Sequence, residues 1–70
     1  MQPQVTEVWA VIHDDSGNNE LVSVHATREG ARRKVEANYP GCEWVVDGDD
    51  REYIPLPHGC LSIEREPLQP

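Results

Sequence analysis

The most regular hydrophobic pattern lies in residues 5–13, Val5-Thr6-Glu7-Val8-Trp9-Ala10-Val11-Ile12-His13, which are rich in β-branched and aromatic side chains. This composition predicts a β-strand, and apolar side chains stand on both of its alternating faces. Residues 14–20 are dense in Asp, Ser, Gly and Asn, which favour turns. Residues 21–26 form a second apolar run, so we expect a hairpin made of these two strands.

The only segment with a helical pattern follows this hairpin, from Thr27 to Pro40. Thr27 can cap the first turn through its hydroxyl oxygen, and Pro40 ends the helix. Ala31, Val35 and Tyr39 fall on one side at a spacing of four residues. This stripe is narrow and built mostly of small side chains. We therefore expect the helix to lie close to a sheet and to cover little of it.

Two or three further strands are expected after the helix. Their predicted positions are 42–46, 51–54 and 60–65. A turn is expected at 47–50, and residues 55–59 are expected to be irregular because two prolines remove ladder donors. In the last strand, alternation should turn Leu61 and Ile63 inward.

Together these elements predict an α+β fold, in the order ββαββ or ββαβββ. We expect an antiparallel sheet of four to five strands with one helix packed on one face. The chain of 70 residues is short enough for a single domain, 1–70, with frayed ends at 1–4 and 66–70.

We expect the helix to pack on the face formed by the small side chains of the first hairpin, Val8, Ala10, Ile12, Val22 and Val24. The opposite face would then lack a second layer. An exposed apolar patch on a small protein usually marks an interface, and Trp is enriched at such sites. The predicted interface residues are Trp9, Val11, Leu21 and Trp44. The alternative is that residues 55–70 fold over this face and close it.

Charge is the next feature: the formal net charge is −7, and four of the six basic residues lie in the predicted helix. An acidic surface repels phosphates, so direct nucleic-acid binding is not expected. The acidic residues gather in the two predicted turns, as Asp14, Asp15, Glu20, Asp47, Asp49 and Asp50. Such an array can imitate phosphate spacing, as in an inhibitor of a nucleic-acid-binding enzyme. The simpler interpretation is two solvated turns.

The candidate chemistry is sparse. Cys42 and Cys60 are expected to be free thiols. Only one close pair of zinc ligands exists, His58 with Cys60, whereas structural zinc usually takes two pairs. The same pair lacks a third orienting group for thiol catalysis. A calcium loop starting at Asp14 would have Asn where glycine is required. We therefore expect no enzyme activity, no metal and no cofactor.

No apolar run approaches membrane-spanning length, and no basic region followed by an apolar one opens the sequence. We expect a cytoplasmic protein without a membrane partner.

Three segments, Val8–Val11, Leu21–Val24 and Ala26–Ala31, resemble a loose group of small uncharacterised proteins of actinobacteria and their phages. The resemblance covers about the first half of the chain. His25-Ala26 stands where an aromatic residue is common in that group, and Gly30 stands where Glu is common. The resemblance implies a phage or prophage origin and binding to a host protein. It carries over no activity and no site residues.

The leading hypothesis is therefore a non-enzymatic interaction protein, phage-encoded, that binds a host protein or forms a homodimer through the sheet face around Trp9 and Trp44. The alternative is an acidic, nucleic-acid-mimicking inhibitor of a host DNA- or RNA-binding enzyme. A small thiol or zinc protein is a third hypothesis.

Overall fold

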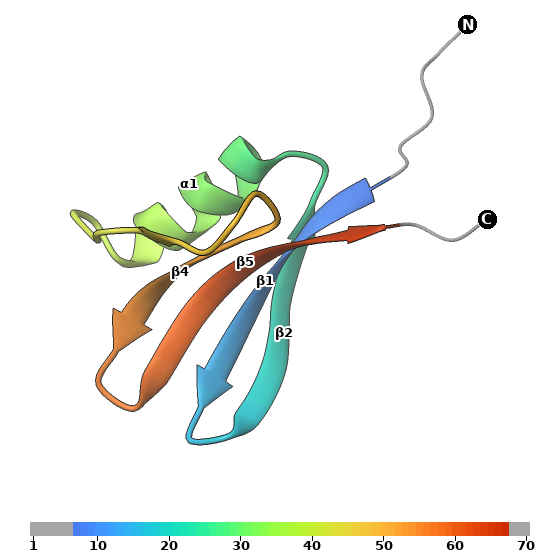
Figure 1. Cartoon of the computed structure of the whole chain (residues 1–70). Helices are drawn as coiled ribbons and strands as arrows, with labels where there is room; N and C mark the ends of the chain where they lie inside the picture. Colours follow the sequence, from blue (N-terminus) through green and yellow to red (C-terminus); the bar gives the residue numbers. More distant parts are fainter. Residues whose placement is uncertain (1–6, 68–70) are drawn as a thin grey trace, which may run out of the picture.

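A computed structural model describes residues 7–67, and the predictions made for residues 1–6 and 68–70 lie outside this range (Figure 1). The elements are β1 (Glu7–Asp15), β2 (Asn18–His25), α1 (Arg28–Asn38), β3 (Val45–Val46), β4 (Arg51–Leu56) and β5 (Gly59–Pro67). The strands form a five-stranded sheet in the order β2-β1-β5-β4-β3, and every pair of neighbouring strands is antiparallel. The predicted α+β fold is confirmed, with the order ββαβββ.

Two tight turns close one end of this sheet. Ser16 and Gly17 have φ angles of 54° and 91°, as the type I′ turn of a two-residue hairpin requires. The Asp14 carboxylate accepts a hydrogen bond from the Gly17 amide at 3.3 Å. The Ser16 amide donates to the carbonyl of His58, in the β4–β5 turn, at 3.0 Å. The tips of the two hairpins are therefore tied together.

The helix begins where the sequence predicted. Thr27 is the N-cap, and its Oγ1 accepts a hydrogen bond from the Gly30 amide at 3.0 Å. A Cβ atom on Gly30 would lie 3.2 Å from this oxygen, so glycine suits the crowded first turn. Ala31 and Val35 are the buried residues of α1, whereas Tyr39, just after it, is largely exposed.

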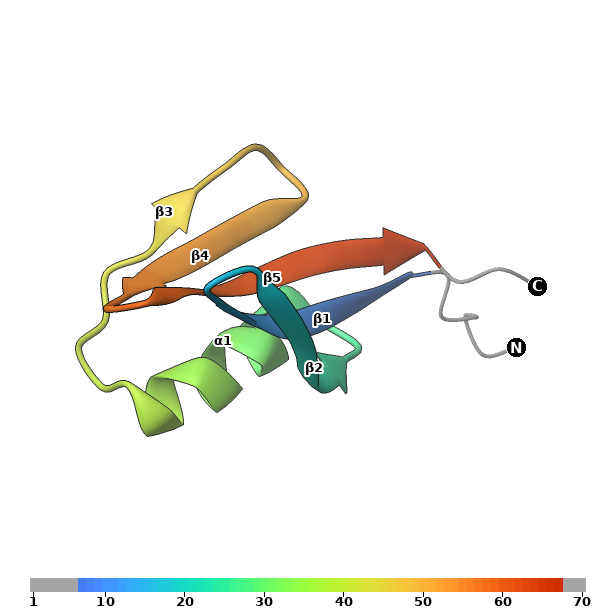
Figure 2. The same ribbon diagram turned by 90° about the horizontal axis from the view of Figure 1, so that it is seen from below.

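The core lies between α1 and one face of the sheet, which we call the covered face. Its buried residues are Trp9, Val11, Ala31, Val35, Ile54, Leu61 and Ile63. Leu61 and Ile63 therefore point inward, as predicted. Figure 2 shows α1 on one side of the sheet, with no other described element against the opposite face.

The predicted side for helix packing was wrong, because α1 covers Trp9 and Val11 rather than Ala10 and Ile12. The reason lies in β5, which enters the sheet between β1 and β4. This pairing places Ile63 directly beside Val11, and both side chains are fully buried. The largest apolar area then gathers on that face, and burying it is worth about 25 cal/mol per Å².

Three local predictions also need correction. Val22 was expected to share a face with Val24, but the β1–β2 register shifts at this point, between Val11 and Ile12 on β1. Residues 55–59 were expected to be irregular, yet Pro55 lies within β4. A proline is tolerated there because β3 pairs only with Glu52 and Tyr53, which leaves the outer side of Pro55 without a described partner. Finally, residues 66–67 belong to β5 rather than to a frayed end.

Candidate functional site

The face of the sheet opposite α1, which we call the open face, is not covered by any described element (Figure 2). Strand registers place on it residues of all five strands. They are Val8, Ala10, Ile12, Asp14, Asn19, Leu21, Val24, Val45, Arg51, Tyr53, Pro55, Cys60, Ser62, Glu64 and Glu66.

Apolar side chains stand at both edges of the open face. On β2, Leu21 is 62% exposed and Val24 is 51% exposed, and on β3 Val45 is 42% exposed. The centre is different, because Ala10 and Ser62 are small and buried among their neighbours. The open face therefore has two apolar margins and a shallow middle.

Polar groups line that middle. Arg51 Nε donates to Glu64 at 3.3 Å, and Arg51 NH1 donates to Asp47 at 3.0 Å. The Arg51 guanidinium also lies over the Tyr53 ring, 5.0 Å from its centroid. Ser62 Oγ donates to Glu64 at 3.2 Å. These groups border a hollow of about 250 Å³, lined by Ile12, Asp14, Asn19, Arg51, Cys60, Ser62 and Glu64.

Two opposing effects act on the pKa of Arg51. Desolvation is the largest single effect and lowers the pKa, but the hydrogen bonds with Glu64 and Asp47, together with the attraction of these two negative charges, outweigh it, so the pKa is above its ordinary value. Arg51 therefore keeps its positive charge, and the centre of the open face presents a fixed ion pair.

On the covered face, the side chains of Arg28, Arg32 and Glu36, spaced four residues apart on α1, contact the β3–β4 region. We call these three side chains the polar clamp. Its contacts are Arg28 to the Asp49 carbonyl at 2.5 Å, Arg32 to Glu52 at 2.5 and 2.8 Å, and Glu36 to Trp44 Nε1 at 3.1 Å. The hydrogen bond with Glu52 raises the pKa of Arg32 above its ordinary value, although desolvation acts in the opposite direction.

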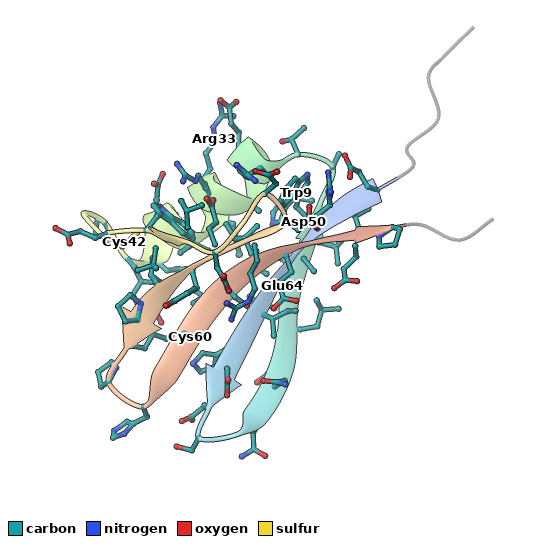
Figure 3. All side chains as sticks on the ribbon, viewed as in Figure 1. Trp9, Arg33, Cys42, Asp50, Cys60 and Glu64 are labelled. Atoms are coloured by element: carbon teal, nitrogen blue, oxygen red, sulfur yellow. The ribbon has the colours of Figure 1, made fainter. Side chains whose placement is uncertain are left out.

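The polar clamp also accounts for the two indole rings. The Arg28 guanidinium lies 4.7 Å from the centroid of Trp9, and that of Arg32 lies 5.1 Å from the centroid of Trp44. Figure 3 shows Trp9 beside α1. Both tryptophans are therefore held by contacts within one chain, on the covered side of the sheet.

The four predicted interface residues do not form one surface. Trp9 and Val11 lie in the core, and Trp44 is half-buried against it. Only Leu21 is exposed on the open face. The open-face positions of Val45 and Tyr53 were not predicted from the sequence, and Val24 was expected on the face packed against the helix. Their own strands gave no signal, because the face that a residue occupies depends on the register between strands.

The predicted acidic patch divides into two groups. Asp14, Asp15 and Glu20 lie at the β1–β2 hairpin end, level with Gly59 of β5. Asp47, Asp49 and Asp50 precede β4, level with Arg65 at the other end of β5. Because a strand rises about 3.3 Å per residue, the groups lie about 20 Å apart.

Two carboxylates of the second group are also paired with arginines. Asp50 forms an ion pair with Arg65, and Asp47 forms one with Arg51. The Asp49 carbonyl is bonded to Arg28. The geometry therefore gives a continuous phosphate-like array little support.

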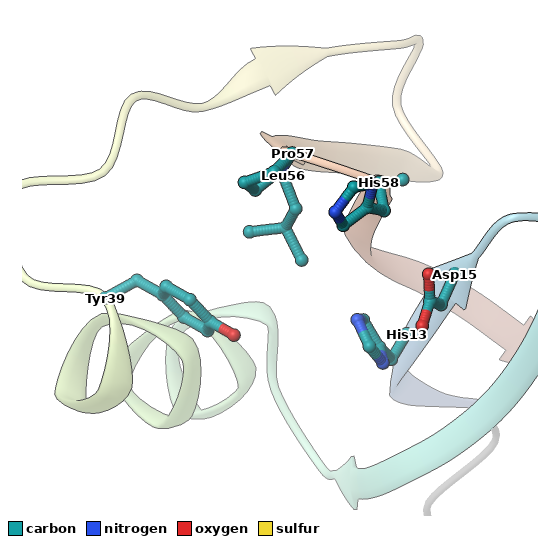
Figure 4. A pocket seen from close by; sticks show the side chains of 7 residues that line it. His13, Asp15, Tyr39, Leu56, Pro57 and His58 are labelled. Carbon is teal, nitrogen blue, oxygen red and sulfur yellow. The ribbon is translucent and has the colours of Figure 1, made fainter.

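A second hollow lies beside the end of α1, on the covered side (Figure 4). It measures about 270 Å³ and is lined by His13, Asp15, Tyr39, Leu56, Pro57, His58 and Gly59. Figure 4 shows His13, His58 and Tyr39 coming from three different segments around the opening. No hydrogen bond joins two of these three side chains within residues 7–67.

The next question is whether the described residues include a metal site or a paired thiol. Within it, no group of three or more His, Cys, Asp or Glu side chains could hold a metal ion. Both cysteines are free. Cys42 packs against the core, whereas Cys60 lines the hollow on the open face, so the two thiols lie on different sides of the sheet.

Between Glu7 and Pro67, no helix has the length and hydropathy needed to cross a membrane. Comparisons with protein-family models, with curated protein sequences and with solved structures gave no match.

Proposed function

We propose that this chain is a non-enzymatic protein-binding module and that the open face is its contact surface. The observation that carries the proposal is a sheet face without a second layer, with exposed Leu21, Val24 and Val45 at its margins. A sheet in a two-layer domain normally buries one face and solvates the other with polar residues. Exposed branched aliphatic residues at both margins of the solvated face favour a role in binding.

The polar residues at the centre of the open face would determine which partner binds. Arg and Tyr are enriched at protein interfaces, and here Arg51 is stacked on Tyr53 and tied to Glu64. A guanidinium held in this way loses little side-chain entropy on binding. The partner that fits is a protein surface with apolar contacts for the margins and polar groups for the Arg51–Glu64 pair.

The resemblance to actinobacterial phage proteins supports a more specific form of the proposal. In that form the chain is a phage-encoded accessory protein, and its partner is a host protein in the host cytoplasm.

Paired variants test which face binds. Val24→Asp/Val45→Asp adds two carboxylates to the open face. The matched control, Val22→Asp/Val46→Asp, adds the same charges to neighbouring residues of the same strands that are 46% and 64% exposed. Val46 is paired with Glu52 on the covered side, and Val22 lines a hollow with Tyr39.

The measurement is quantitative capture of host-lysate proteins on immobilised wild-type and variant chains, after circular dichroism has shown equal folding. We expect specific captured proteins to be retained by the control and lost with the open-face variant. Equal capture by both variants, or loss only with the control, would contradict the proposal.

A further inference from the structure

The outer edge of β2 is the most exposed strand edge among the described residues. β2 is eight residues long and pairs only with β1. Natural edge strands are usually protected by lysine, proline, a β-bulge or a very short length. β2 has the sequence NNELVSVH, which contains neither lysine nor proline, and its only protective feature of this kind is the register shift at Val22. The residues on either side of Val22 keep a regular strand pairing with β1. The other edge is protected differently, because β3 has only two residues and β4 contains Pro55.

We propose that β2 pairs antiparallel with β2 of a second copy of this chain. The two-fold axis stands perpendicular to the sheet and passes between Val22 and Ser23. The two five-stranded sheets then continue into one another, with both helices on the same side.

The register follows from the faces that the β2 side chains occupy. Leu21 is paired with Ile12 and Val24 with Ala10, so both Leu21 and Val24 lie on the open face. The proposed axis sets Leu21 opposite Val24 of the second copy, and the symmetry repeats this contact. Two pairs of exposed apolar side chains are thereby brought together on one face, as cross-strand packing requires.

The covered side of β2 gives a second, independent match. Glu20 is paired with His13 and His25 with Trp9, so Glu20 and His25 both lie on the covered side. The same axis sets Glu20 opposite His25 of the second copy, where the imidazole can donate a hydrogen bond to the carboxylate. His25 Nε2 lies 2.8 Å from Ser23 Oγ, which fixes the orientation of the ring.

The bulge at Val22 makes this register self-complementary. In a regular strand, residues 21 and 24 would point to opposite faces. The register shift on β2 brings them to the same face. A register displaced by one residue would set Leu21 opposite Ser23 or His25 of the second copy, whose side chains lie on the covered side.

The consequence for binding rests on the proposed function, because pairing at β2 would join two open faces into one larger surface. The pairing of the two copies depends only on residues of the β2 edge.

Cysteine cross-linking in the full chain tests both the dimer and its register. The background is Cys42→Ser/Cys60→Ser, to which Leu21→Cys/Val24→Cys is added. Within one chain these two positions lie about 10 Å apart along the strand, too far for a disulfide. Under mild oxidation we expect a disulfide-linked dimer in high yield. Neither single-cysteine variant nor the control pair Leu21→Cys/Val45→Cys should give this yield.

Light scattering during size-exclusion chromatography of the wild-type chain should give twice the mass of one chain at high concentration. Val24→Asp should shift this equilibrium toward monomer at least tenfold, whereas Val45→Asp, at the opposite edge, should leave it unchanged. A monomer at every concentration, together with cross-linking no better than the control, would overturn the proposal. A dimer that cross-links equally in the control would overturn it as well.

Failure here is distinguishable from failure of the proposed function. Val45→Asp alone lies far from β2, so it can abolish partner capture without affecting self-association. A monomeric chain whose capture is still lost with Val45→Asp would keep the proposed function and exclude the dimer.

Discussion

The covered face and the open face carry the same kind of ion pair in different surroundings. On the covered face, Arg32 makes a two-pronged contact with Glu52, whose side chain is 1% exposed. On the open face, Arg51 meets Glu64 at 3.3 Å, and that side chain is 32% exposed. Water therefore screens the Arg51–Glu64 pair, whereas the Glu52 carboxylate is shielded from water.

The apolar residues repeat this contrast. Val11 and Ile63 are paired across β1 and β5 beneath α1, and both are fully buried. One residue further along β1, Ile12 is paired with Ser62 on the open face and is only partly buried. Apolar burial is therefore concentrated on the covered face, and the contact surface proposed above lies on the other face.

The largest expected effect on the free energy of unfolding concerns Ile63 on the covered face, compared with Ile12 on the open face. Ile63→Ala should lower the free energy of unfolding by about 3 kcal/mol, because it leaves a cavity in a well-packed core. Ile12→Ala makes the same chemical change on the open face and should cost about 1 kcal/mol. Urea unfolding followed by circular dichroism measures both values. Equal losses would show that the two faces are packed alike.

The next effect concerns Gly59, where β5 begins beside β1. A Cβ atom at this position would lie 1.8 Å from the Asp14 carbonyl oxygen, so Gly59→Ala forces the two strands apart. We expect a loss of about 2 kcal/mol in the free energy of unfolding. His58→Ala, an exposed neighbour in the same turn, is the control and should change it by less than about 0.5 kcal/mol. A neutral Gly59→Ala variant would contradict the β1–β5 register.

The two ion pairs give effects no larger than the effect at Gly59. Glu52→Gln should cost about 2 kcal/mol, since it leaves the partly buried Arg32 without its charged partner. Glu64→Gln should cost at most about 0.5 kcal/mol, because its pair with Arg51 is more exposed. Thermal unfolding of the two variants in parallel provides the measurement. A larger loss for Glu64→Gln would reverse the assignment of the faces.

The smallest effect is expected at the sheet margins. Val45→Asp and Val46→Asp should each change the free energy of unfolding by no more than about 0.5 kcal/mol, because both residues are exposed. Their stabilities should be equal while their capture of a partner differs. A large loss of stability in Val45→Asp would mean that this residue is packed within the chain.

Much of the fold could be predicted from local sequence, because local chemistry determines it. The turn around Gly17, the Thr27 cap and the alternation of Leu61 and Ile63 each involve residues close together in the chain. The side on which α1 packs could not be predicted in this way. It depends on β5 lying beside β1, a pairing that joins Val11 to Ile63 across most of the chain.

The candidate site was harder to predict for the same reason. Tryptophans indicate an interface only when they are exposed, and Arg28 and Arg32 hold Trp9 and Trp44 inside the chain through contacts that no local pattern shows. The acidic residues of the two predicted turns could form one array only if the turns lay side by side, whereas the antiparallel strands place them at opposite ends of the sheet.

The proposed function requires that the open face of the sheet is accessible to solvent and to a partner. Methyl NMR of the purified full chain, with a soluble paramagnetic agent added, tests it most directly. We predict strong broadening of the Ile12 and Val45 methyl signals and little broadening of those of Val11, Val35 and Ile63. Protection of Ile12 and Val45 equal to that of Val11 would mean that another part of the chain covers this face, which would contradict the account.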